Sequence, residues 1–87
     1  MAESGTKKKI TVEIHGQTYT IVGDASTGHM RSVAQEVDDR MGQLAKVFPH
    51  LDVAKLAVLS AINICNDYLL LKKEYEALME LLDQKTK

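Results

Sequence analysis

Few residues in this sequence have the type and spacing that chemistry requires. The soft metal ligands are His15, His29, His50 and Cys65, and no two of them stand at a short spacing such as CxxC or HxxxH. Cys65 lies among apolar residues, which disfavours a reactive thiolate, so we expect a small buried hydrophobic residue there. His15 precedes a glycine, where a turn is expected. The pattern therefore predicts no metal site.

Acid–base catalysis has no better support. Asp38 and Asp39 are adjacent, and on a helix neighbouring side chains diverge by about 100°, so this pair cannot share a proton as a carboxylate dyad. The sequence contains no phosphate-binding loop, nucleophile elbow or dinucleotide fingerprint. We therefore expect no catalytic residue, no cofactor and no enzymatic activity.

The composition indicates one small folded domain. The chain has 87 residues, 45% of them hydrophobic and 26% charged, and Lys+Arg 11 against Asp+Glu 12 gives a net charge of −1. Because phosphate binding needs an excess of basic residues, we expect no nucleic-acid partner. Uninterrupted apolar runs do not exceed four residues, as at 68–71, whereas a membrane span needs about 20. With a single cysteine, these features predict a cytoplasmic protein without a membrane partner.

Two β-strands are predicted near the N-terminus. Residues 1–8 are small, polar and basic, and we expect them to form a flexible tail. Across 9–22, apolar residues alternate with polar ones on both sides of the link His15-Gly16-Gln17, which predicts a β-hairpin. A lone hairpin is only marginally stable in water, so the rest of the chain or a partner must cover its apolar face.

A short helix is predicted over 26–46. Ser26 or Thr27 can cap its first turn, and Pro49 ends it because proline disfavours helical geometry in the preceding residue. Its apolar positions recur at steps of three and four and form one stripe: Met30, Val33, Ala34, Val37, Met41 and Leu44.

The most informative stretch is 53–85, which contains neither glycine nor proline and follows Asp52, a good helix cap. A helix of this length extends about 50 Å, whereas the other ordered residues would form a head about 25 Å across, so the helix must protrude. We expect an α+β fold in two parts. The hairpin, the short helix and the start of the long helix form a head domain, 9–66, and 67–87 is the coiled-coil extension of the long helix.

The two halves of the long helix differ in their apolar pattern. The first half is apolar on most sides, which predicts that protein surrounds it. The second half has a coiled-coil seam with alternating steps of three and four: Tyr68, Leu71, Tyr75, Leu78 and Leu82. Because the chain offers no second helix long enough to cover this seam, another copy must do so. We expect Ala61, Asn63 and Ile64 to take part as well.

The oligomer is expected to be a dimer that can pair again into a tetramer, because Met79 and Leu81 widen the apolar face beyond a two-stranded seam. Asn63 leaves two alternatives open. It could bond its own copy and fix the register of the helix pair, or it could bond the backbone of the head.

Several segments, in order, resemble the ZapA family of bacterial division proteins. Residues 11–21 (TVEIHGQTYTI) look like the family's V-x-I-x-G-x-x-Y-x-I opening. Val33-Ala34 and 37–41 (VDDRM) look like its V-A-x-x-V-D-x-x-M helix, and 56–64 (LAVLSAINI) is similar to its L-A-x-L-x-A-x-N-I stretch. The resemblance covers about residues 12 to 82. Within the family, the long helix at 53–85 is one of the shorter C-terminal helices and is similar to that of the forms from Gram-positive bacteria.

The resemblance implies a protein partner, FtsZ, the tubulin-like division GTPase, and a location at the mid-cell division ring. ZapA-like proteins bind FtsZ polymers and promote their lateral association, so the implied function is a non-enzymatic crosslinker with two or more heads. On the polar side of the first helix, four charged residues are candidates for FtsZ contact: Arg31, Glu36, Asp39 and Arg40. An ordinary solvated face accounts for them more simply, since charge is expected on a surface helix. Without the resemblance, the pattern also fits a small coiled-coil adaptor or chaperone-like oligomer with another protein partner.

Overall fold

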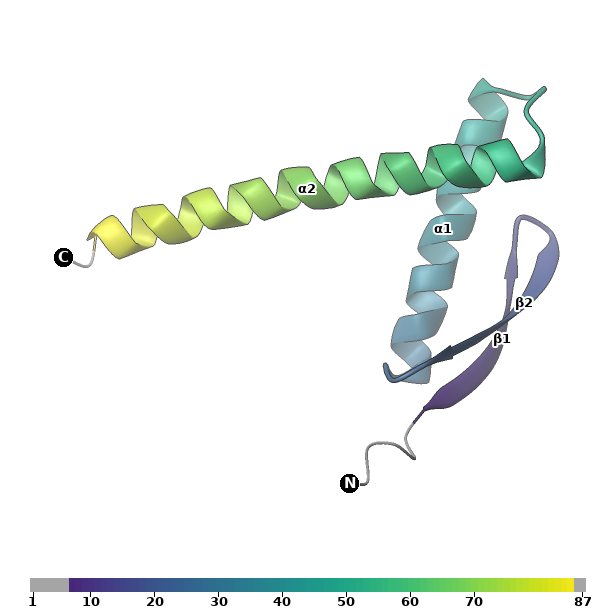
Figure 1. Cartoon of the computed structure of the whole chain (residues 1–87), viewed down its shortest axis with the longest axis horizontal. Coiled ribbons are helices and arrows are strands. Elements are labelled where there is room, and N and C mark those ends of the chain that lie inside the picture. Colours follow the sequence, from purple (N-terminus) through teal and green to yellow (C-terminus); the bar gives the residue numbers. More distant parts are fainter. Residues whose placement is uncertain (1–6, 86–87) are drawn as a thin grey trace.

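The computed structural model describes residues 7–85, which form two strands followed by two helices (Figure 1). β1 (Lys8–Ile14) and β2 (Gln17–Gly23) form an antiparallel hairpin, and α1 (Thr27–Val47) and α2 (Val53–Lys85) follow. The α+β fold is confirmed, and each element begins and ends within one residue of its predicted range, apart from the turn. The predicted tail is wrong at its end, because residue 8 already belongs to β1. Its residues 1–6 lie outside the described residues.

A two-residue turn joins the strands. Ile14 pairs with Gln17, so the link is His15 and Gly16 alone, and Gln17 is the first residue of β2 rather than part of the link. The φ angles are 50° at His15 and 78° at Gly16, and positive φ at both positions is what a type I′ turn requires. The His15 backbone N–H donates a hydrogen bond to Asp38 Oδ1 at 2.7 Å. This bond ties the turn to α1.

The left-handed backbone at Gly16 gives a first prediction. Gly16→Ala should lower the free energy of unfolding by about 1–2 kcal/mol, because a Cβ atom is strained at positive φ. Apart from the two neighbours in the chain, no atom of the described residues lies within 4 Å of the added Cβ, so the cost is in the backbone and not in a clash. Gly28→Ala, in the first turn of α1 and also in open space, is the matched control and should be neutral or stabilising. Urea unfolding measures both, and equal effects would contradict the assignment of strain to the turn.

The hairpin is covered by α1. Ile10 and Val12 of β1 are buried against Met30 and Ala34 of α1, and Ile14 and Ile21 pack against this cluster. Ser26 caps α1, since its Oγ accepts a hydrogen bond from the His29 backbone N–H at 3.1 Å. The first core is therefore built within the chain, and it covers one face of the sheet.

The two helices meet at a second buried region. Met41 of α1 and Leu56 and Ser60 of α2 are each at most 4% exposed. α2 begins after Asp52, whose Oδ1 accepts from the Lys55 backbone N–H at 2.8 Å, as the predicted cap requires. Ser60 is 2% exposed and its Oγ has no hydrogen-bond partner in the described part of the chain. A small side chain at this position lets the helices approach closely.

α2 crosses α1 and then leaves the head (Figure 1). The described chain measures 53 × 43 × 16 Å, and its radius of gyration is 17.5 Å. A compact chain of this length would have a radius of gyration of about 12 Å. The predicted protrusion of the long helix is therefore confirmed.

Candidate functional site

The candidate site is an exposed apolar stripe along the protruding part of α2. Every side chain from 65 to 84 is exposed, although this stretch is rich in leucine. The five predicted seam residues, here called the distal seam, lie between 49% and 63% exposed: Tyr68, Leu71, Tyr75, Leu78 and Leu82. Soluble proteins rarely leave such a continuous apolar surface open, and where they do it marks an interaction site.

The distal seam continues back to the start of α2. The same alternating steps of three and four connect it to Ala54, Ala57, Ala61 and Ile64, of which the three alanines are exposed and Ile64 is half-buried. The predicted oligomerisation residues Ala61 and Ile64 therefore lie in line with the distal seam. Small residues at this end would let a second helix approach α2 closely where it crosses the head.

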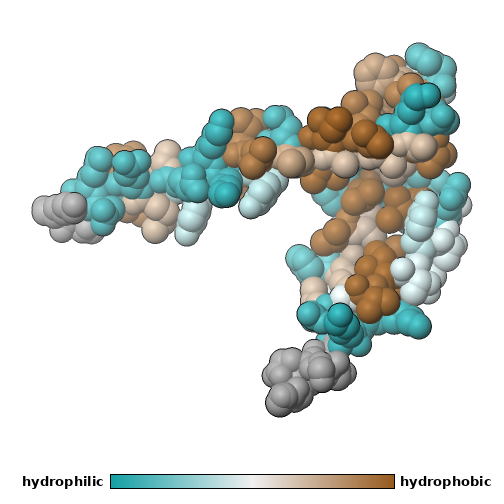
Figure 2. Space-filling view, in the orientation of Figure 1, coloured by the Kyte–Doolittle hydropathy of each residue, from teal (hydrophilic) through white to brown (hydrophobic). Residues whose placement is uncertain are grey.

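In the single chain, α1 encloses only part of the first half of α2, so the expectation that protein surrounds this half stays a prediction for the oligomer. α1 covers only the side that carries Leu56 and Ser60, whereas Val58 and Ile62 are 61% and 62% exposed. Cys65, expected to be buried, is exposed as well. Figure 2 shows hydrophobic surface gathered over the first half of α2, beside the head. One short helix cannot enclose a helix that is apolar on several sides.

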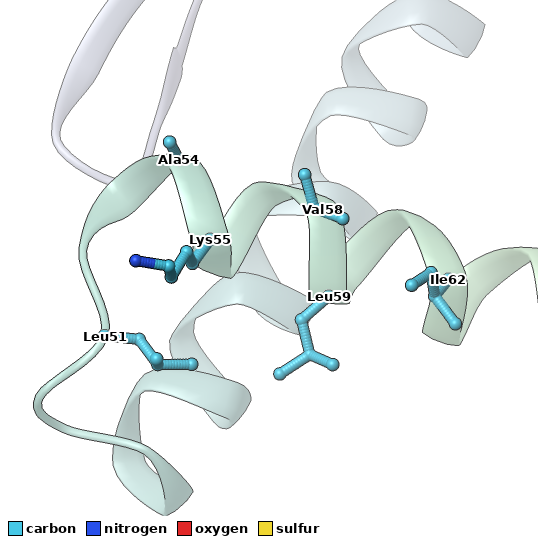
Figure 3. A pocket seen from close by; sticks show the side chains of 6 residues that line it. All are labelled: Leu51, Ala54, Lys55, Val58, Leu59 and Ile62. Carbon is cyan, nitrogen blue, oxygen red and sulfur yellow. The ribbon is translucent and has the colours of Figure 1, made fainter.

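A shallow groove of about 390 Å³ lies on this open side of α2 (Figure 3). The loop before α2 contributes Leu51, and the first three turns of α2 supply the other residues: Ala54, Lys55, Val58, Leu59 and Ile62. The lining is apolar apart from Lys55, whose side chain lies between Ala54 and Leu51 in Figure 3 and whose Nζ is 3.8 Å from Asp52 Oδ2. Such a surface can pack against another apolar helix, and it offers no group for chemistry.

The structure separates the four charged candidates on α1. Arg31 is exposed, and among the described residues it makes no hydrogen bond or ion pair. Asp39 Oδ1 accepts a hydrogen bond from Gln35 Nε2 at 3.0 Å. Arg31 and Gln35 line a polar groove between α1 and β1 with Thr11, Val12, Glu13, Ala34 and Asp38. Arg31, Glu13 and Asp38 form a charged surface on the side of α1 that faces β1.

Arg40, in contrast, is bound to α2. Its Nε donates to Glu36 Oε2 at 3.1 Å, its Nη2 lies 2.6 Å from Asp67 Oδ2, and its Nη1 donates to Asn63 Oδ1. The hydrogen bond to Asp67 is the main cause that raises the pKa of Arg40 above its usual value; desolvation opposes it. Asn63 thus bonds a side chain of the head and not the head's backbone, while the alternative that it bonds its own copy stays a prediction.

The sequence could suggest the Glu36–Arg40 pair, because residues four apart on a helix are neighbours. It could not suggest Asp67, which is 27 positions from Arg40 and comes close only where α2 crosses α1. The hydrogen bond from His15 to Asp38 was missed for the same reason. Asp38 and Asp39 have separate partners, so the expected divergence of this pair is confirmed.

Within residues 7–85, no three histidine, cysteine or acidic side chains gather in a way that could hold a metal ion. In the same part of the chain, α2 is long and apolar enough over 53–84 to cross a membrane, judged by length and composition alone. An apolar helix of a soluble assembly meets the same criteria. The expected absence of a membrane partner stays a prediction.

The fold and its surfaces define a class: a small α+β head carrying a protruding helix whose apolar seam the single chain leaves uncovered. Comparison with known proteins is consistent with this class. The family model for "Cell division protein ZapA" matches residues 10–87. The chain belongs to the ZapA family of cell division proteins.

Individual relatives are similar over nearly their whole length. A cell division protein ZapA from Bacillus mycoides (strain KBAB4) is 51% identical over 83 residues, which cover 95% of this chain and 93% of the relative. One from Geobacillus sp. (strain WCH70) is 52% identical over 82 residues, covering 94% and 93%. Among solved structures, a ZapA mutant dimer from Geobacillus stearothermophilus matches with a TM-score of 0.72 and 51% identity, covering 88% of this chain and 90% of that chain.

Proposed function

We propose that this chain self-associates through α2 and crosslinks FtsZ filaments with the heads of the resulting oligomer. The observation that carries the proposal is the exposed apolar seam on a helix that leaves its own head. Its occupant is a second copy, because the seam has the heptad spacing of helix pairs and runs from the head to the end of the described helix. The solved relative, described as a dimer, supports this choice.

Valency explains how such a protein acts without chemistry. Each head binds a filament weakly, and once one head is bound, the α2 pair holds another at a high effective concentration near the neighbouring filament. Several weak contacts then act as one strong crosslink. The length of α2 sets the separation of the heads, and a further pairing of dimers into a tetramer through Met79 and Leu81 would add heads.

The filament contact is proposed on α1, with Arg31 as the leading candidate and Asp39 as the second. Glu36 and Arg40, which lie on the side of α1 that meets α2, are the remaining candidates. Arg31 is exposed beside the polar groove between α1 and β1 and makes no described interaction within the chain. A cation in this state keeps its full hydrogen-bonding capacity for a partner. In cells, the proposal places the oligomer in the cytoplasm at the mid-cell division ring.

The test is a light-scattering and pelleting assay of FtsZ assembled with GTP. The intact chain should raise scattering and sediment with the polymer. The double variant L71N/L78N, which breaks the distal seam, should lose the scattering increase, while K73N/E80N on the opposite side of the helix should keep it. Failure of the intact oligomer both to sediment with FtsZ and to raise scattering would overturn the FtsZ assignment and leave an oligomer with another protein partner.

The charged surface is tested in the same assay. Arg31→Glu should reduce sedimentation with FtsZ without changing the oligomeric state, because Arg31 lies on the head and away from α2. Asp24→Lys, in the connector before α1, is the control for a charge reversal elsewhere on the head. Unchanged binding by the Arg31 variant would remove this residue from the contact surface.

A further inference from the structure

All three nitrogen atoms of the Arg40 guanidinium group have partners, and two of them join α1 to α2. Glu36 is its partner on α1, and Asn63 and Asp67 are its partners on α2. The Arg40 side chain is 21% exposed, whereas Glu36 and Asp67 are about half exposed at 56% and 53%. The cation therefore lies between the helices with the two carboxylates at the solvent side.

The position of this cluster along α2 matters for the geometry of the molecule. The buried contact between the helices lies at Leu56 and Ser60. A single packed crossing fixes where two helices touch, but it leaves them able to swivel about the point of contact. Asp67 lies two turns beyond Ser60, about 10 Å further along the helix axis at 1.5 Å per residue. The Arg40–Asp67 bond is therefore a second contact between the helices, away from the buried one, and it opposes rotation of α2 about the buried contact.

We infer that Arg40 is a positioning residue that fixes the direction in which α2 leaves the head. The planar, forked guanidinium group suits this role because it holds three acceptors on two helices in one geometry, which a lysine ammonium group on a flexible stem does not. Loss of the cation also leaves the Glu36 and Asp67 carboxylates without the positive charge that both contact, and their mutual repulsion then favours a different angle. The inference goes beyond the proposed function and does not depend on it.

The consequence is largest at the far end of α2. Leu82 lies 22 residues beyond Ser60, so a swing of about 10° at the crossing moves the end of the helix by about 6 Å at 1.5 Å rise per residue. The direction of α2 sets how each head is held relative to the pairing helix. A loosened crossing would therefore leave an oligomer whose heads vary in orientation.

The experiment measures the distance between head and helix in the full chain. Spin labels are placed at Thr20→Cys in β2 and Lys73→Cys in α2, both exposed positions, in a Cys65→Ser background. Dilution with a large excess of unlabelled protein leaves at most one labelled chain in each oligomer. Pulsed electron paramagnetic resonance then measures the distance between the two spin labels of that chain. FtsZ is absent, so the result is independent of the filament proposal.

The expected result is a narrow distance distribution in the parent chain that broadens and shifts in Arg40→Met. Arg40→Lys, which keeps the positive charge but lacks the planar guanidinium group, should also broaden the distance distribution. Arg31→Met is the matched control, since it removes the same group from the same helix and should leave the distribution unchanged. In the parent chain, raising the salt concentration to 1 M, where the Debye length is about 3 Å, should broaden the distribution partway.

Two results would overturn the inference. One is an unchanged distribution in Arg40→Met, which would mean that apolar packing alone sets the angle. The other is a parent-like distribution in Arg40→Lys, which would mean that the positive charge of Arg40 is sufficient and the geometry of its guanidinium group is not needed. Circular dichroism checks that each variant keeps its helix content. If Arg40→Met does not fold, Asp67→Asn is the second variant, because it removes the α2 carboxylate that contacts Arg40. Its distance distribution should broaden in the same way, by a smaller amount. A parent-like distribution in Asp67→Asn would also contradict the inference.

Discussion

Substitution of two distal-seam leucines, Leu71→Asn and Leu78→Asn, is expected to weaken self-association by at least about a thousandfold. Both side chains are more than half exposed in the single chain, at 63% and 55%, so the head loses no packing when they are replaced. Burying one leucine contributes about 1.5–3 kcal/mol, and a pair of chains would bury two from each. A thousandfold change corresponds to about 4 kcal/mol, which is less than the full burial of four leucines would contribute. The prediction therefore holds even if these side chains are only partly buried in the oligomer.

The control for this prediction is K73N/E80N. Lys73 and Glu80 lie on α2 at the positions opposite the seam in the heptad, and the double change leaves the net charge of the chain as it was. Analytical ultracentrifugation over a concentration series measures the association of both variants. Equal weakening in the two would mean that helix propensity and not the seam governs assembly, and an unchanged oligomer in L71N/L78N would place the interface elsewhere.

Local patterns in the sequence were enough to predict each element. Alternation around His15-Gly16 identified the hairpin, and the cap at Asp52 followed by a long stretch without glycine or proline gave α2 with its observed bounds. These signals are local because backbone conformation depends on neighbouring residues and on the period of the apolar positions. The unusual length of α2 also predicted that it would leave the head, which needs only a comparison of two lengths.

The packing between elements could not be predicted in the same way. Which side of α2 faces α1 depends on where the helices cross, and the sequence offered several apolar sides with no means to choose between them. The buried side contains Ser60, a residue that no apolar pattern would select. The partners of Arg40 and Asp38 follow from that choice, so the role of Arg40 in joining the helices emerged only with the structure.

The stability of the head should depend strongly on the buried crossing. Leu56→Ala is expected to lower the free energy of unfolding by about 2–4 kcal/mol, through the lost burial and the cavity left behind. Leu56 is 3% exposed between α1 and α2. Since a domain of this size has a total stability of only about 4–13 kcal/mol, this single change removes a large part of it. Urea unfolding followed by circular dichroism measures the effect, with all variants at one protein concentration because association adds to stability.

Leu70→Ala makes this experiment informative about the assembly as well. It is the same substitution in the same helix, at a position 52% exposed in the single chain and outside the alternating steps of the seam. If only the seam side of α2 is covered in the oligomer, Leu70→Ala should change stability by less than about 0.5 kcal/mol. A loss as large as that of Leu56→Ala would mean that a further copy covers this side of the helix too. Such a result would contradict a simple helix pair and favour the tetramer, because a bundle of four helices buries a wider face of each helix than a pair does.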